Sequence, residues 1–176
     1  MDLTEKTVRK NYVYRGKIVS LRCDDAVLPD GKACKREVVE HTGGACVLCV
    51  KDGCVALVKQ FRYAYGEELL EIPAGKINEG ERPEVCAHRE LSEETGLLAE
   101  KLQLLHVLYP TPGYDNEKIY IYYADGVSQG EAHLDEGEFL NVVYLPVEEA
   151  LKMIEEDKIR DAKTIVALYR YALMQR

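Results

Sequence analysis

The stretch Gly75–Leu97, GKINEGERPEVCAHRELSEETGL, carries the clearest pattern in this chain of 176 residues. Pro83 suits the first turn of a helix, and Gly96 suits the position just after its end. Three residues between them recur at helical spacing and predict an inward-facing stripe: Ala87, Leu91 and Thr95. The pattern therefore predicts a helix that follows a loop and ends at a glycine.

The same predicted helix carries a cluster of carboxylates. Glu90, Glu93 and Glu94 are three and four residues apart and fall on one face. Like charges at this spacing destabilise a helix by about 0.2–0.5 kcal/mol per pair. The cluster is either a solvated acidic surface or a site for hard divalent cations, which prefer carboxylate oxygens. The spacing alone leaves both interpretations open.

The wider spacing of the stretch reads G-x5-E-x7-R-E-U-x-E-E-x-G-U, where U is a bulky aliphatic residue. At every defined position this resembles the Nudix box of the Nudix hydrolases. The matching residues are Gly75, Glu81, Arg89, Glu90, Leu91, Glu93, Glu94, Gly96 and Leu97. The resemblance implies a pyrophosphohydrolase that uses Mg²⁺ or Mn²⁺, with two or more ions during catalysis.

The resemblance also implies the metal ligands. Glu90 and Glu94 correspond to the main ligands, and Glu93 to a further ligand or a group that orients water. The carbonyl of Ala74, just before the box, corresponds to an additional ligand.

Three other residues of the box have supporting roles by the same resemblance. Arg89 orients the box glutamates through charge-assisted hydrogen bonds and counts, with Glu93, among the catalytic residues. Glu81 helps to fix the loop, and Gly96 is structural.

Outside the box, the chain resembles the ADP-ribose pyrophosphatase branch of the family over nearly its whole length. The segments that carry this likeness are KREVVEH from Lys35, QFR from Gln60, EIPAG from Glu71, PTPGY from Pro110, DEGE from Asp135 and DAKT from Asp161. In addition, Pro112 lies sixteen residues after Gly96, where a proline marks enzymes of this type. The branch implies a nucleoside diphosphate sugar as substrate.

Four residues are predicted to bind the substrate: Arg62, Arg36, Glu37 and Pro112. Arg62 matches an arginine that contacts phosphate in the branch, and a planar guanidinium suits bidentate phosphate binding. Arg36 and Glu37 are predicted to contribute from the N-terminal unit, across a dimer interface. A cross-strand ion pair is the structural alternative for Arg36.

The general base is expected in the acidic segment LDEGEFLNV. The candidates are Glu138, which we prefer, and Glu136. A solvated turn before a strand would have the same acidic-glycine-acidic sequence.

Composition restricts the remaining choices. The net charge of −8 argues against nucleic acid or an anionic membrane as the main partner. No apolar stretch is long enough for a membrane span or resembles a secretory signal, which predicts a cytoplasmic protein with reduced cysteines. Cys46 and Cys49 have the spacing of half a zinc site, but without a second pair they are expected to be core thiols.

The rest of the chain predicts mixed strands and helices. Expected strands are 45–50, 54–60, 102–109, 118–124 and 140–145, and residues 69–75 are expected to form a short strand that ends in a loop. Helices are expected over 148–156 and 162–174. The fold class is therefore α/β (α+β): a Nudix-type α/β/α sandwich with a mixed sheet, plus a small N-terminal antiparallel β unit. We expect the boundary near residue 42, giving a dimer-forming unit at 1–42 and a catalytic domain at 43–176.

The expected activity is metal-dependent hydrolysis of ADP-ribose or a related nucleoside diphosphate sugar to AMP, or another nucleoside monophosphate, and a sugar phosphate. A pyrophosphatase for GDP-mannose or ADP-glucose is the nearest alternative. A Nudix domain that binds nucleotides without catalysis is another, although such domains usually lose box carboxylates that are intact here.

Overall fold

The computed structural model describes residues 2–175, which form two compact units. The first contains the chain up to Thr42 together with Tyr109–Lys118, and the second contains Gly43–Leu108 and the chain from Ile119 onward. The chain passes from the first unit to the second after Thr42. The expected division had placed Tyr109–Lys118 in the catalytic domain. These residues pair with the N-terminal unit instead, because Val39 exchanges backbone hydrogen bonds with Tyr114 and Asn116.

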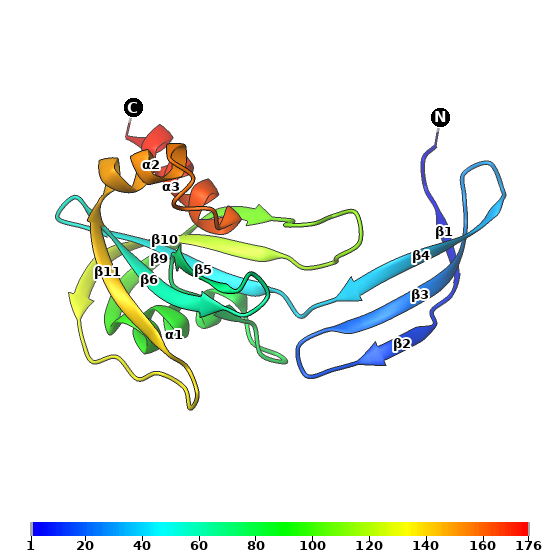
Figure 1. Ribbon diagram of the computed structural model, residues 1–176, viewed down its shortest axis with the longest axis horizontal. Helices are drawn as coiled ribbons and strands as arrows, with labels where there is room; N and C mark the ends of the chain where they lie inside the picture. The colour runs from blue at the N-terminus through cyan, green and yellow to red at the C-terminus, as the bar shows by residue number, and fades with distance from the viewer. Residues whose placement is uncertain (1, 176) are drawn as a thin grey trace. The chain divides into compact units, whose positions relative to one another are not determined.

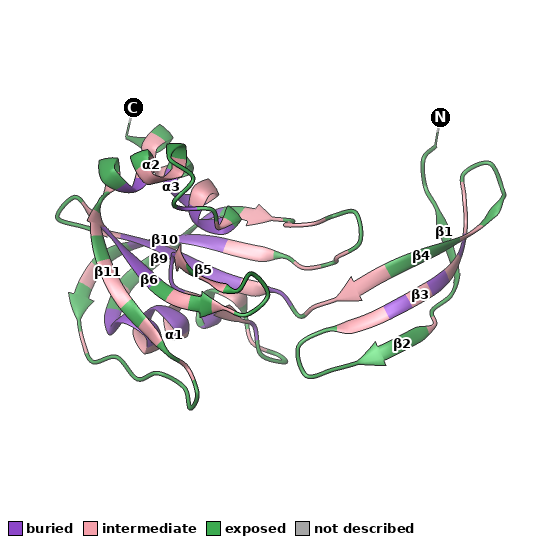
Figure 2. Cartoon of the chain, viewed as in Figure 1, coloured by how far each residue is buried: buried purple, intermediate pink, exposed green. Residues whose placement is uncertain are grey.

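The N-terminal unit is an antiparallel sheet (Figure 1). Its described strands are β1 (Lys6–Arg9), β2 (Tyr12–Arg15), β3 (Ser20–Val27) and β4 (Ala33–Glu40). β3 pairs with all three of the others. β1 and β2 are exposed along their length, whereas β3 alternates between buried and half-buried residues (Figure 2).

The second unit is built on a mixed sheet whose central order is β11-β6-β5-β10-β9, with β7 beside β6 and β8 beside β5. The strands are β5 (Gly44–Lys51), β6 (Cys54–Arg62), β7 (Glu67–Glu71), β8 (Ala74–Lys76), β9 (Leu97–Leu108), β10 (Ile119–Gln129) and β11 (Leu140–Pro146). β5 and β10 are parallel, and the neighbouring pairs are antiparallel. The mixed sheet agrees with the expected fold class.

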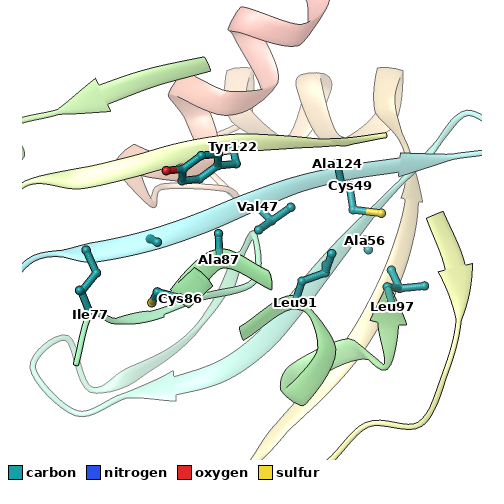
Figure 3. Close-up of a cluster of buried hydrophobic side chains, with 11 residues drawn as sticks. Val47, Cys49, Ala56, Ile77, Cys86, Ala87, Leu91, Leu97, Tyr122 and Ala124 are labelled. Carbon is teal, nitrogen blue, oxygen red and sulfur yellow. The ribbon is translucent and has the colours of Figure 1, made fainter. Parts of the chain in front are cut away.

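Helices cover both faces of this sheet. α1 (Pro83–Thr95) lies on one face, and α2 (Val147–Glu155) and α3 (Ala162–Met174) lie on the other (Figure 1). Ala87 and Leu91 project from α1 toward Val47 of β5 and are fully buried (Figure 3). Burial of a leucine side chain such as Leu91 contributes about 2 kcal/mol. The predicted stripe is therefore the face that fixes α1 to the sheet. Among the described residues, no helix is long and apolar enough to cross a membrane.

Local sequence determines where α1 ends and how β5 is joined to β6. α1 begins at Pro83 and stops at Gly96, whose φ of 70° is the left-handed conformation that glycine adopts at low cost. β9 then starts at once, at Leu97 and not at residue 102 as expected, because Leu97 pairs with Gln129 of β10. A turn at Asp52 and Gly53 joins β5 to β6, and the two strands pair only at its base, through Val50 and Lys51.

Candidate active site

The C-terminal half of α1 turns two of the three clustered glutamates inward. Glu90 and Glu94 are buried beside Leu91, and Glu93 remains half-buried. Because water is largely excluded from these two carboxyl groups, a solvated acidic surface does not describe this face of the helix. Of the two interpretations that the spacing left open, the solvated surface therefore does not apply to Glu90 and Glu94.

Arg89 is the centre of the hydrogen-bond network around these carboxylates. Its Nη1 donates to Glu90 at 2.6 Å and to Glu93 at 2.9 Å. Its Nε and Nη2 donate to the two oxygens of Glu81 at 3.0 and 3.1 Å, and Nη2 also reaches the carbonyl of Lys76 at 3.3 Å. Glu81 in turn accepts from the backbone N–H of Asn78 at 2.9 Å. One guanidinium thus joins the helix to the loop that precedes it.

Among the box glutamates, Glu94 is the one whose burial is least offset by hydrogen bonds. Its Oε2 accepts from the backbone N–H of Ala74 at 2.9 Å, but its Oε1 is buried with no hydrogen-bond partner among the described residues. Burial raises the pKa of Glu94 to about 8, the charges of Glu90 and Glu138 add to this rise, and the charge of Arg62 opposes it. Burial also raises the pKa of Glu90, against the influence of Arg89.

Gly75 leaves the space that the Glu90 carboxylate fills. A Cβ placed on Gly75 would lie 1.9 Å from Oε1 and 2.0 Å from Cδ of Glu90. The first glycine of the motif is therefore required by close approach of a side chain, and it brings the loop before α1 next to a carboxylate.

Arg62, at the end of β6, is held by a buried acid on the neighbouring strand. Its Nε and Nη2 donate to the two oxygens of Glu71 at 2.6 Å each. Lys163, at the start of α3, also donates to Glu71 and bonds Asp161 at 2.9 Å. The side chain of Arg62 is 39% exposed, whereas that of Glu71 is 2% exposed. The phosphate-binding candidate is thus anchored on one side and accessible on the other.

The two candidates for the general base differ in position. Glu136 is exposed, and Glu138 is half-buried. The negative charge of Glu138 contributes to the raised pKa of both Glu90 and Glu94, although burial is the larger cause in each case. Glu138 therefore shares the surroundings of the box carboxylates. The loop Asp135–Phe139 and the strand residues Gln60 and Phe61 line a hollow of about 440 Å³.

The remaining substrate candidates meet within the N-terminal unit. Arg36, Glu37 and Pro112 line one pocket of about 240 Å³, with Tyr114 on its wall. The guanidinium of Arg36 is paired with Glu5, at 2.8 and 2.7 Å. Glu5 precedes β1, so this ion pair is not the cross-strand pair considered as the alternative role of Arg36. The association with Tyr109–Lys118 brings Pro112 to this pocket.

Known proteins match the chain over both units. The family model for the NUDIX domain matches residues 39–168. The family model for the nucleoside diphosphate sugar hydrolase N-terminal domain matches residues 5–39. The chain belongs to the Nudix family.

Individual Nudix relatives cover nearly the entire chain. An ADP-ribose pyrophosphatase of Bacillus subtilis (strain 168) is 43% identical over 95% of this chain and 92% of its own length. The methanol dehydrogenase activator of Bacillus methanolicus is 39% identical over 97% of this chain and 94% of its own length. The crystal structure of an ADP compounds hydrolase shares the fold, with a TM-score of 0.86 at 22% identity over 99% of this chain and 96% of that chain.

Nudix hydrolases generally use divalent metal ions, and the residues around Glu94 fit such an ion. The unpartnered Oε1 of Glu94 supplies a buried carboxyl oxygen, and Glu90 is buried four residues earlier on the same helix. Within residues 2–175, no three acidic, histidine or cysteine side chains converge as a complete ligand set. Glu90 and Glu93 turn their oxygens to Arg89, and Glu94 turns one of its oxygens to Ala74.

Glu71 and Lys163 have no expected role from the sequence, although they lie in the segments EIPAG and DAKT that resemble the ADP-ribose pyrophosphatase branch. The available signal was a charged residue inside the apolar segment LLEIPAG. The expectation for the cysteines was correct: Cys46 and Cys49 are buried, free thiols. Burial raises the pKa of Cys49 to about 11, which makes it a poor nucleophile.

Replacing Gly75 with alanine is expected to weaken Mn²⁺ binding at least about tenfold while changing the melting temperature little. The added methyl group would occupy the place of the Glu90 carboxylate, and that flexible side chain can rotate away without unfolding α1. Calorimetric titration with Mn²⁺ measures the effect. Gly113→Ala is the control, because nothing lies within 4 Å of a Cβ there. Unchanged Mn²⁺ affinity in Gly75→Ala would exclude Glu90 from the metal site.

The metal-free protein is expected to lose stability as the pH rises from about 4.5 to about 8. Glu94 has a raised pKa of about 8 in the folded state, so the folded protein binds more protons than the unfolded chain in this window. The free energy of unfolding should fall across it by on the order of a few kcal/mol. Urea unfolding in chelator at several pH values measures this slope, which Glu94→Gln should reduce. The same slope in both proteins would contradict the prediction.

Proposed function

We propose that this Nudix protein hydrolyses the diphosphate bond of ADP-ribose, or of a closely related nucleoside diphosphate sugar, to AMP and ribose 5-phosphate or the corresponding products. The observation that carries the proposal is the buried, unpartnered Oε1 of Glu94 in the same surroundings as Arg62 and Glu138. A cation-binding oxygen, a phosphate-binding cation and an acid that can take a proton are the groups that this reaction needs.

The chain's own residues have distinct roles in the proposal. Glu90, Glu94, Glu93 and the carbonyl of Ala74 would hold Mg²⁺ or Mn²⁺, with two or more ions during catalysis. The bound ions supply positive charge to the diphosphate and lower the pKa of water. Arg89 orients Glu90 and Glu93, Arg62 binds a phosphate oxygen, and Glu138 accepts the proton of the attacking water.

A panel of dinucleotides and nucleotide sugars tests the proposal. Purified protein with Mg²⁺ should release AMP from ADP-ribose at a higher kcat/KM than it achieves with GDP-mannose or ADP-glucose. Preference for either of those sugars would assign the chain to the alternative substrate. Absence of turnover across the panel would reject the enzyme and favour a domain that binds nucleotides without hydrolysing them.

We also propose that the protein is a homodimer and that Arg36 and Glu37 serve the site of the second copy. Support comes from the large apolar side chains exposed in the N-terminal unit, which include Val8 on β1, Val13 on β2 and Ile18 between β2 and β3. Light scattering should report twice the mass of the chain, and Val13→Asp should shift the equilibrium toward monomer. A wild-type protein that is monomeric at the assay concentration would remove the shared-site role of Arg36.

A further inference from the structure

A chain of alternating charges connects Arg62 to the first turn of α3. Glu71 accepts two hydrogen bonds from Arg62 and one from Lys163, and Lys163 also donates to Asp161. Asp161 caps α3 by accepting from the backbone N–H and the hydroxyl of Thr164, at 3.0 and 2.5 Å. The four charged side chains sum to zero, so Glu71 is offset by two cations and not by Arg62 alone.

The geometry leaves one edge of Arg62 available. Glu71 occupies the edge formed by Nε and Nη2, and no hydrogen bond in the described part of the chain uses Nη1. An arginine presents five N–H donors in a fixed plane, so an anchored Nε edge also fixes the direction of the Nη1 end. That end carries the donors that can form a bidentate contact with a phosphate oxygen pair.

Lys163 contributes a charge that this arrangement needs. Its side chain is 10% exposed, and its hydrogen-bond partners in the described part of the chain, Glu71 and Asp161, are acids. If Lys163 were absent, the full charge of Glu71 would fall on Arg62, and the positive potential at the open edge would drop. A link that served only to attach α3 would not require a second cation on Glu71.

We propose that Glu71 and Lys163 are positioning residues for Arg62, with Glu71 fixing the guanidinium and Lys163 offsetting the charge of Glu71, so that the open edge binds the diphosphate. This inference rests on the proposed function, because it assigns Arg62 to the substrate. Neither residue contacts the reacting atoms, so both act through Arg62.

Lys163→Met tests the proposal, since methionine retains the length of the side chain without its charge. The KM for ADP-ribose should rise about tenfold, which corresponds to one weakened charge-assisted contact, while kcat stays within about threefold. Lys163→Arg should restore KM. Lys152→Met, an exposed lysine on α2, is the matched control and should leave both constants unchanged. If Lys163→Met does not fold, the double variant Glu71→Gln, Lys163→Met removes both charges and takes its place.

A double-mutant cycle separates positioning from a general structural role. In an Arg62→Ala background, Lys163→Met should have no further effect on KM, because the residue through which it acts is gone. Multiplicative effects of the two substitutions, or a loss of kcat at constant KM, would overturn the inference.

The positioning role of Lys163 can be tested separately if the proposed hydrolase function is wrong. If the wild type hydrolyses no nucleotide sugar, the same variants are titrated with inorganic pyrophosphate and Mg²⁺ by calorimetry. A roughly tenfold weaker affinity in Lys163→Met would still support the positioning role. Equal affinity in all variants, or no binding by the wild type, would overturn it.

Discussion

Glu94→Gln is expected to lower kcat for ADP-ribose by about 10³-fold, because a loss of about 4 kcal/mol follows from removing one charged metal ligand. Glu94 supplies the one buried oxygen of the box that lacks a protein partner in the described residues. Glutamine has the same shape and can still accept the hydrogen bond from Ala74, but it carries no charge for a cation. Steady-state kinetics and Mn²⁺ titration on the same preparation measure both losses.

The fold of this variant should be preserved. A neutral side chain avoids the cost of burying the charged carboxylate, so the melting temperature of the metal-free protein should not fall. Glu84→Gln, an exposed glutamate in the first turn of the same helix, is the control and should retain activity. Near-normal turnover of Glu94→Gln would remove Glu94 from the metal site.

Glu138→Gln is expected to lower kcat by about 10²–10⁴-fold, the range that general-base catalysis contributes. Its effect on Mn²⁺ affinity should be small, because Glu138 is proposed to serve the water and not to hold the metal ion. A low kcat with normal Mn²⁺ affinity distinguishes Glu138→Gln from Glu94→Gln, which should lose both turnover and Mn²⁺ affinity. The measurement is kcat at saturating Mg²⁺ together with calorimetric Mn²⁺ titration.

Glu136→Gln is the matched control for the base. Glu136 lies two residues away in the same loop but is exposed. It should retain most of the activity. The reverse outcome, with the large loss in Glu136→Gln, would assign the base to Glu136.

The predicted helix was readable from the sequence because its signals are local, whereas the role of Arg89 was implied by the resemblance to the Nudix box. Pro83 and Gly96 define the ends of α1 through their own backbone preferences, and Leu91 marks its buried face. Arg89 reaches Glu81, eight residues earlier, because one loop and two helical turns separate them. Short-range rules therefore place the box carboxylates on one helix, and the resemblance supplies their expected roles.

The support of Arg62 was not readable, because it depends on pairings far apart in the chain. Glu71 and Lys163 are 92 residues apart, and no periodicity relates a strand end to the start of the last helix. The placement of Tyr109–Lys118 with the N-terminal unit is a similar case, since an isolated β-bridge joins Val39 and Asp115. Local patterns identify such segments without indicating their partners.

The loop that carries Glu138 is fixed at both ends. On one side, the backbone N–H of His133 donates to the carbonyl of Glu93 at 2.9 Å, which ties the chain to the last turn of α1. On the other side, Leu140 is paired with Gln60 at the start of β11. Residues 134–139 therefore form a span of set length between the helix and the sheet. Adding or removing a residue there would move the Glu138 carboxyl group relative to the box carboxylates while leaving both attachments intact. Changes in the length of this span are therefore a route by which evolution or engineering can alter the substrate range.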